Sequence, residues 1–117
     1  MKRIFETSLI VPAARGCVKI NRDRNKNYVI KVQISNLAEP DRLQPPRKTY
    51  VVWSVDEDNS VQNIGQLSSK IRFITHRLRA SLNALSSIKP AIIFITAEDV
   101  PGIQEPVTMA VMTTKIF

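Results

Sequence analysis

Residues 50–56 constrain the fold of this chain more than any other stretch. They hold the only tryptophan, Trp53, among β-branched residues, and the acidic segment 56–60 follows directly. β-Branched and aromatic residues favour strands, whereas Asp and Asn favour turns. The segment therefore predicts a central strand whose Trp53 faces an opposing sheet, with the other apolar runs pairing with it or packing over it.

The remaining apolar runs are short and are separated by turn signals. Apolar and polar residues alternate in 17–22 and in 28–35, on either side of the polar turn 23–27, which predicts a half-buried β-hairpin. Residues 91–97 are continuously apolar over the length of a strand buried on both faces. Gly65 indicates a bulge or a close backbone approach inside a strand. Further strands are expected at 4–11, 61–67 and 107–114.

Two segments are less regular. Three prolines exclude a regular strand or helix interior from residues 36–48, where Leu37 and Leu43 are expected to cap the core. Residues 70–87 fit a helical stripe and an alternating strand equally well. We favour a strand over 71–79, followed by a short turn or helical piece.

Strands of this number and spacing predict one all-β domain over residues 1–117. About seven to eight short strands separated by turns are typical of an antiparallel β-sandwich of immunoglobulin-like design. A chain of 117 residues is long enough to bury a core of its own.

Catalytic and metal-binding signatures are missing from the sequence. Its single Cys17 and single His76 cannot supply the four ligands of a structural zinc site. It has no phosphate-binding loop, dinucleotide-binding turn or nucleophile elbow. We therefore expect no enzymatic activity, no metal and no cofactor.

The charged residues are unevenly placed along the chain. The formal net charge is +7, and residues 59–97 contain no acid. Such a bias can attract polyanions, although a solvated basic face that serves solubility alone explains it better. Alternation along one strand would divide the basic residues into two pairs on opposite faces, which predicts weak, salt-sensitive and sequence-independent binding of nucleic acid. The candidate polyanion-binding residues are Lys70, Arg72, Arg77 and Arg79.

Two acidic clusters, 56–59 and Glu98–Asp99, could each offer oxygen ligands to calcium. The first is explained by the preference of Asp and Asn for turns. Glu98 follows a buried strand directly, so we expect it to be hydrogen-bonded at one end of the sandwich. Glu98 and Asp99 together form a candidate interaction surface.

The expected location is the cytoplasm. Lys2 and Arg3 resemble the start of a signal peptide, but Glu6 interrupts the apolar stretch that follows. No apolar run approaches the ~20 residues of a membrane-spanning helix. The lone Cys17 does not indicate an oxidising compartment.

Four short motifs stand along the chain: Tyr50-x-x-Trp53-x-Val55-Asp56, Ile64-Gly65-x-Leu67, Ile95-Thr96-Ala97-Glu98 and Glu105-Pro106. Together they resemble the C-terminal extracytoplasmic domain of anti-sigma-K factors, in particular stand-alone proteins of Bacteroidetes type. The resemblance implies an immunoglobulin-like β-sandwich without enzyme activity. An insertion separates the last two motifs, and the chain shows no zinc-containing anti-sigma domain, so sigma-factor binding is not carried over.

The leading functional hypothesis is a non-catalytic domain that binds another protein, in envelope or stress-response signalling. The alternative hypothesis is a basic domain that binds nucleic acid or another polyanion without sequence specificity. An aromatic content of 6% weakens this alternative for single strands, because their recognition relies on base stacking.

Overall fold

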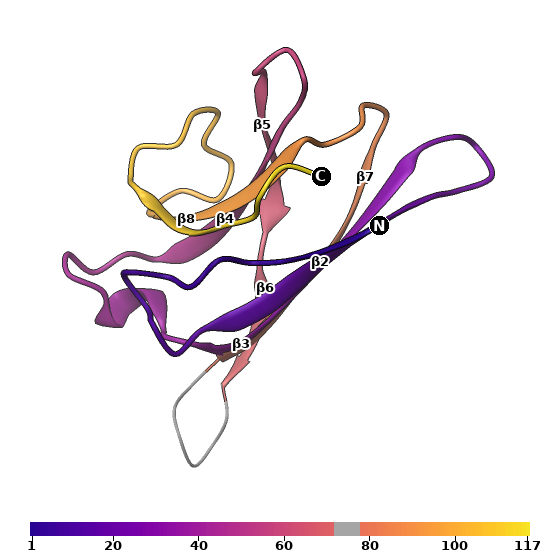
Figure 1. The fold of residues 1–117 in the computed structure, drawn as a ribbon. Coiled ribbons are helices and arrows are strands. Elements are labelled where there is room, and N and C mark those ends of the chain that lie inside the picture. Colours follow the sequence, from indigo (N-terminus) through magenta and orange to yellow (C-terminus); the bar gives the residue numbers. More distant parts are fainter. Residues whose placement is uncertain (72–77) are drawn as a thin grey trace.

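Nine strands form two antiparallel sheets in the computed structural model, which describes residues 1–71 and 78–117 (Figure 1). One sheet has the order β1-β2-β3-β7-β6 and the other the order β5-β4-β8-β9. Within the described residues the one helical element is the short 3-10 turn η1 (Pro40–Arg42). The strands are β1 (Lys2–Ile4), β2 (Arg15–Arg22), β3 (Tyr28–Leu37), β4 (Thr49–Val55), β5 (Val61–Gln66), β6 (Ser68–Ile71), β7 (Leu78–Ser86), β8 (Ile92–Glu98) and β9 (Ala110–Thr113). The expectation of an all-β fold is confirmed.

The hairpin predicted around residues 23–27 is formed by β2 and β3. Its register runs from Arg22 opposite Tyr28 to Arg15 opposite Ser35. Asp23 closes the turn, because its Oδ1 accepts hydrogen bonds from the backbone N–H groups of Asn25 and Asn27, at 2.8 and 2.9 Å. Alternation then buries one face of the hairpin and leaves the other exposed, as the sequence predicts.

The strand that carries Trp53 is central in its sheet. β4 pairs with β5 on one side and with β8 on the other. The continuous apolar run of 91–97 corresponds to β8, which is buried over most of its length. Residues 50–55 of the tryptophan-containing segment 50–56 therefore lie in a central strand of the four-stranded sheet.

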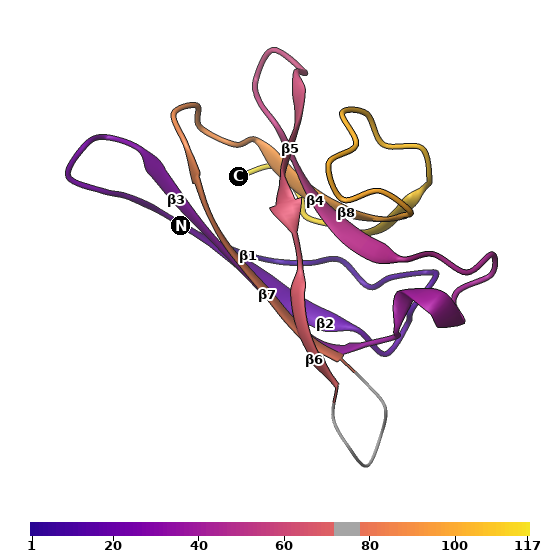
Figure 2. The ribbon, with the colours of Figure 1, turned by 180° about the vertical axis from the view of Figure 1, so that it is seen from behind.

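β5 and β6 are almost one strand, but they belong to different sheets. The chain passes from the edge of one sheet to the edge of the other at Leu67, whose N–H donates to the carbonyl of Tyr50 at 3.0 Å (Figure 2). Just before the crossing, the register slips so that Gly65 pairs with Val52, and Asn63 with Trp53. Gly65 has a φ of +136°, a conformation that strongly favours glycine. The bulge expected at Gly65 is confirmed, and this break explains why the strands exceed the expected number.

Three expected elements differ from the structure. β7 continues to Ser86 in full register with β3, so the turn or helical piece expected after Arg79 is wrong. Ala80, Leu82 and Ala84 pack in or against the core while Ser81 and Asn83 are exposed, and this alternation is that of a strand and not of a helix. The strand expected at 4–11 is wrong, because β1 ends at Ile4 and residues 5–11 form no strand, and the strand expected at 107–114 is shortened to β9.

Both sheets contribute to a single hydrophobic core. Leu37 is fully buried in it and Leu43 packs against it, which confirms the capping expected of both. Tyr50 also lies in the core, and its hydroxyl donates to the carbonyl of Ala38 at 2.7 Å. Burial raises the pKa of Tyr50 well above its usual range. The fully buried aliphatic members of this core are Val18, Ile20, Ile30, Val32, Leu37, Val52, Ile93 and Ile95.

The described parts of the chain contain no helix with the length and apolar character needed to cross a membrane.

Candidate functional site

Trp53 lies on the face of its sheet that points away from the opposing sheet. Tyr50 and Val52 belong to the core between the sheets, and successive strand residues point to opposite faces. Trp53 is fully buried, yet it stands outside that core and stacks on its cross-strand partner Phe94, with ring centroids 6.2 Å apart. The expectation that Trp53 faces the opposing sheet is therefore wrong. Neighbouring residues of a strand point to opposite faces, so the burial of Val52 between the sheets places Trp53 on the outer face.

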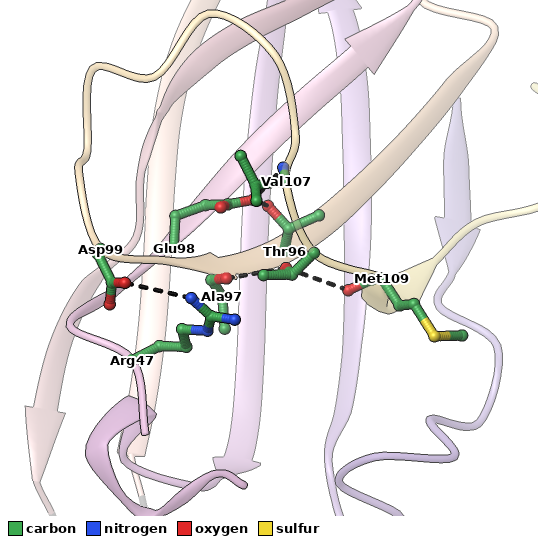
Figure 3. Close-up of polar contacts among 8 residues, drawn as sticks. Arg47, Thr96, Ala97, Glu98, Asp99, Val107 and Met109 are labelled. Atoms are coloured by element: carbon green, nitrogen blue, oxygen red, sulfur yellow. Dashed lines mark hydrogen bonds and ion pairs between the residues drawn. The ribbon is translucent and has the colours of Figure 1, made fainter. Parts of the chain in front are cut away.

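A chain of hydrogen bonds begins at Trp53 on this outer face. The Trp53 Nε1–H donates to Thr96 Oγ1 at 2.8 Å, and the Thr96 hydroxyl donates to Glu98 Oε2 at 2.6 Å. The same carboxyl oxygen accepts the backbone N–H of Val107 at 3.2 Å (Figure 3). Glu98 is only 1% exposed. Two buried polar side chains thus connect the indole to the loop between β8 and β9.

The loop that joins β8 to β9, residues 99–109, is held over the outer face of the sheet by contacts along its length. Asn63, which pairs with Trp53 across the strands, donates from Nδ2 to the carbonyls of Pro101 and Ile103, each at 2.9 Å. The Thr108 hydroxyl donates to the carbonyl of Ala97 at 2.8 Å. These bonds fix the middle and the end of the loop on the sheet face that carries the buried Trp53.

The start of the loop is fixed by an ion pair. Arg47 Nη1 lies 3.1 Å from Asp99 Oδ2, and the Arg47 side chain is 26% exposed (Figure 3). Both ends and the middle of the loop are therefore tied to the rest of the domain. A loop fixed in this way loses little conformational entropy when it binds a partner.

The same loop presents apolar side chains to solvent. Val100 is 58% exposed, Val107 is 71% exposed and Met109 is 82% exposed. Single exposed apolar residues are ordinary, but three on one fixed loop are the composition of a contact surface. The loop therefore combines a buried polar base with an exterior on which three large apolar side chains are exposed.

The structure separates the two residues of the candidate interaction surface. Glu98 is buried and anchors the loop from below, whereas Asp99 is exposed and pairs with Arg47. Any effect of Glu98 on binding must act through the loop. The residues that carry the site, Asn63, Thr96, Val107 and Met109, were not identified in the sequence. One signal was present, because alternation in residues 92–98 places the polar Thr96 and Glu98 on the same face of an otherwise apolar strand.

The candidate polyanion-binding residues that the structure describes lie on two strands, and not on one strand as the sequence predicts. Lys70 in β6 and Arg79 in β7 are directly opposed in an antiparallel pair, not placed along one strand. Arg72 and Arg77 lie outside the described residues. The expected separation into two pairs on opposite faces of one strand is therefore wrong for Lys70 and Arg79.

Cys17 lies partly buried in β2 with a free thiol. Among the residues that the structure describes, no three His, Cys, Asp or Glu side chains gather closely enough to hold a metal ion. Comparison with protein-family models, curated proteins and solved structures found no match to this chain.

Proposed function

We propose that this chain is a non-catalytic binding domain of the immunoglobulin-like class, which contacts a protein partner through the β8–β9 loop. The observation that carries the proposal is the loop itself. It is fixed from below by Asn63, Glu98 and Arg47 while it exposes Val100, Val107 and Met109. Binding residues are commonly found on loops that a rigid scaffold positions.

The strand order supports the immunoglobulin-like part of the proposal. Immunoglobulin constant domains pair strands A-B-E-D in one sheet and C-F-G in the other. If β2 to β9 are lettered A, B, C, C′, D, E, F and G, the two sheets read A-B-E-D and C′-C-F-G, with β1 added beside A. The β8–β9 loop then corresponds to the F–G loop, which in antibody variable domains takes part in binding.

The energetics favour a partner with an apolar recess. Full burial of an exposed valine or methionine side chain yields about 1.5–3 kcal/mol, so three of them supply several kcal/mol towards an interface. Because the loop is already fixed, little of this gain is offset by ordering the loop backbone. A role in envelope or stress-response signalling remains a proposal supported only by the resemblance of residues 50–56 and 95–98 to anti-sigma-K domains.

The proposal is tested by capturing partners from cell extract with matched variants. Val107→Asp and Met109→Asp place a charge on the loop exterior, and we expect each to abolish capture of a partner that the parent protein retains. Leu85→Asp is the control, because Leu85 is 65% exposed but lies in β7 of the other sheet. Circular dichroism and melting curves confirm that each variant is folded.

The pattern of loss decides the outcome. A partner lost with both loop variants and retained with Leu85→Asp supports binding through the loop. A partner retained with both loop variants, or lost equally with the control, contradicts it.

A further inference from the structure

A row of three lysines crosses the outer face of the five-stranded sheet. The register places Lys2 of β1 opposite Lys19 of β2, and Lys19 opposite Lys31 of β3. All three residues are exposed. Neighbouring strands lie about 4.8 Å apart, so the row forms a line of positive charge on adjacent strands.

The sheet that carries this row contains no acidic residue in any of its five strands. In the part of the chain that the structure describes, the ion pairs are Arg42–Glu39 and Arg47–Asp99, and neither involves a lysine of the row. Like charges directly opposite one another destabilise a sheet. An anionic ligand that lies along the row would relieve this repulsion.

The surroundings of the row are polar and suit contacts with phosphate oxygens. Asn83 of β7 follows Lys31 in the same row, and Gln33 and Ser81 oppose each other in the next exposed row. Arg15 and Arg79 are exposed on the same sheet, further along β2 and β7. Amide and hydroxyl groups commonly donate hydrogen bonds to phosphate, beside lysine and arginine.

We propose that this face binds the phosphate backbone of duplex nucleic acid, without reading its sequence. The geometry favours a duplex over a single strand, because none of the exposed positions of these strands carries an aromatic ring for base stacking. The sheet's one aromatic residue among the described positions, Tyr28, packs against the core and lies under Arg22, whose guanidinium carbon is 4.8 Å from the ring centroid.

A membrane surface is less well matched than a duplex. Membrane-binding faces combine basic residues with a continuous apolar area that enters the lipid. Here the exposed apolar residues Ile4 and Leu85 stand on opposite sides of the lysine row, two positions from it along β1 and β7. Lysines act as mobile point charges rather than as bidentate readers, which accounts for the absence of sequence selectivity.

The test is a salt titration of a short fluorescent DNA duplex of mixed sequence, followed by anisotropy. Three phosphate contacts predict a slope of log affinity on log salt of about −2.7, so that affinity falls about 40-fold between ~50 and ~200 mM salt. A triple variant, Lys2→Gln with Lys19→Gln and Lys31→Gln, should lower affinity at ~50 mM salt by more than about tenfold and flatten the slope by about 2 to 3.

A charge-matched control separates a binding face from net charge. Lys48→Gln, Lys89→Gln and Lys115→Gln remove the same charge from exposed positions outside the five-stranded sheet, so both triple variants change from +7 to +4. The proposal requires the control to retain the parent slope. Equal loss of binding in both variants would show a net-charge effect and overturn it.

Two further ligands complete the test. A single strand that binds more tightly than the duplex overturns the proposal, as do anionic vesicles that bind through the row when the duplex does not. Because this face and the β8–β9 loop lie on different sheets, failure here leaves the protein-binding proposal untouched.

Discussion

Trp53→Ala should destabilise the domain strongly even though Trp53 lies outside the core between the sheets. Its side chain is fully buried on the outer sheet face to which the β8–β9 loop is bound. Truncation of a buried tryptophan to alanine costs about 3–5 kcal/mol through lost burial and the cavity left behind. For a chain of this size that corresponds to a fall in melting temperature of about 10–25 °C. Urea denaturation monitored by circular dichroism measures the change.

The hydrogen bond from Trp53 to Thr96 makes a separate contribution, which a double-mutant cycle isolates. Thr96→Val leaves the buried Trp53 Nε1–H without its acceptor, at a cost of about 1–3 kcal/mol. Trp53→Phe should then cost less in the Thr96→Val background than in the parent, because the unpaired N–H has been removed. The expected coupling is about 0.5–3 kcal/mol.

Two results would refute this reasoning. If Trp53→Ala melted within a degree or two of the parent, the indole would not be packed as described. If the cycle gave additive free energies of unfolding, the Trp53–Thr96 hydrogen bond between β4 and β8 would make no measurable contribution to stability.

Two other substitutions test the fold. Gly16→Ala should lower the denaturation midpoint, because a Cβ there would lie 2.5 Å from the backbone oxygen of Gln33, whereas Gly102→Ala, with no atom within 4 Å, should be neutral. Burial raises the pKa of Tyr50. Above about pH 10 the unfolded chain therefore loses the phenol proton while the folded state keeps it. The free energy of unfolding should be constant in this respect below about pH 10 and should fall above it. Tyr50→Phe should reduce this loss of stability at alkaline pH, measured as the difference between the urea midpoints at about pH 8 and about pH 11. At the lower pH the variant should be about 1 kcal/mol less stable than the parent, because it lacks the hydrogen bond to Ala38.

The fold was predictable wherever local pattern and burial agree. Alternation in residues 28–35 identifies a strand and its buried face, and the mostly apolar run of 91–97 identifies a strand buried on both faces. Trp53 was predicted as buried but assigned to the wrong face, because alternation alone does not say which face of a central strand meets the other sheet. The loop on its outer face is held by contacts between residues distant in sequence, such as those of the Asn63 side chain with the carbonyls of Pro101 and Ile103.

Sites that depend on the register between strands could not be predicted from the sequence. Lys19 and Lys31 fall on the polar face of the predicted hairpin, but only strand pairing shows that they are opposite each other and that Lys2 extends the row. Conversely, the bias in residues 70–79 was visible as composition, yet the pairing of Lys70 with Arg79 required the β6–β7 hairpin. Charge composition is local information, whereas a charged surface is a property of the folded sheet.

The crossing of the chain at Leu67 also bears on aggregation. An exposed sheet edge invites a strand from another molecule to pair with it, and long flat edges are the most hazardous. Here one continuous segment forms an edge of each sheet, and it changes sheet after the six residues of β5, with a bulge before the change. A strand from a second copy that paired along β5 would therefore find no further backbone hydrogen bonds beyond Leu67, where the segment leaves this sheet. The crossing thus limits edge-to-edge association on this side of the domain without placing a charge or a proline in β5.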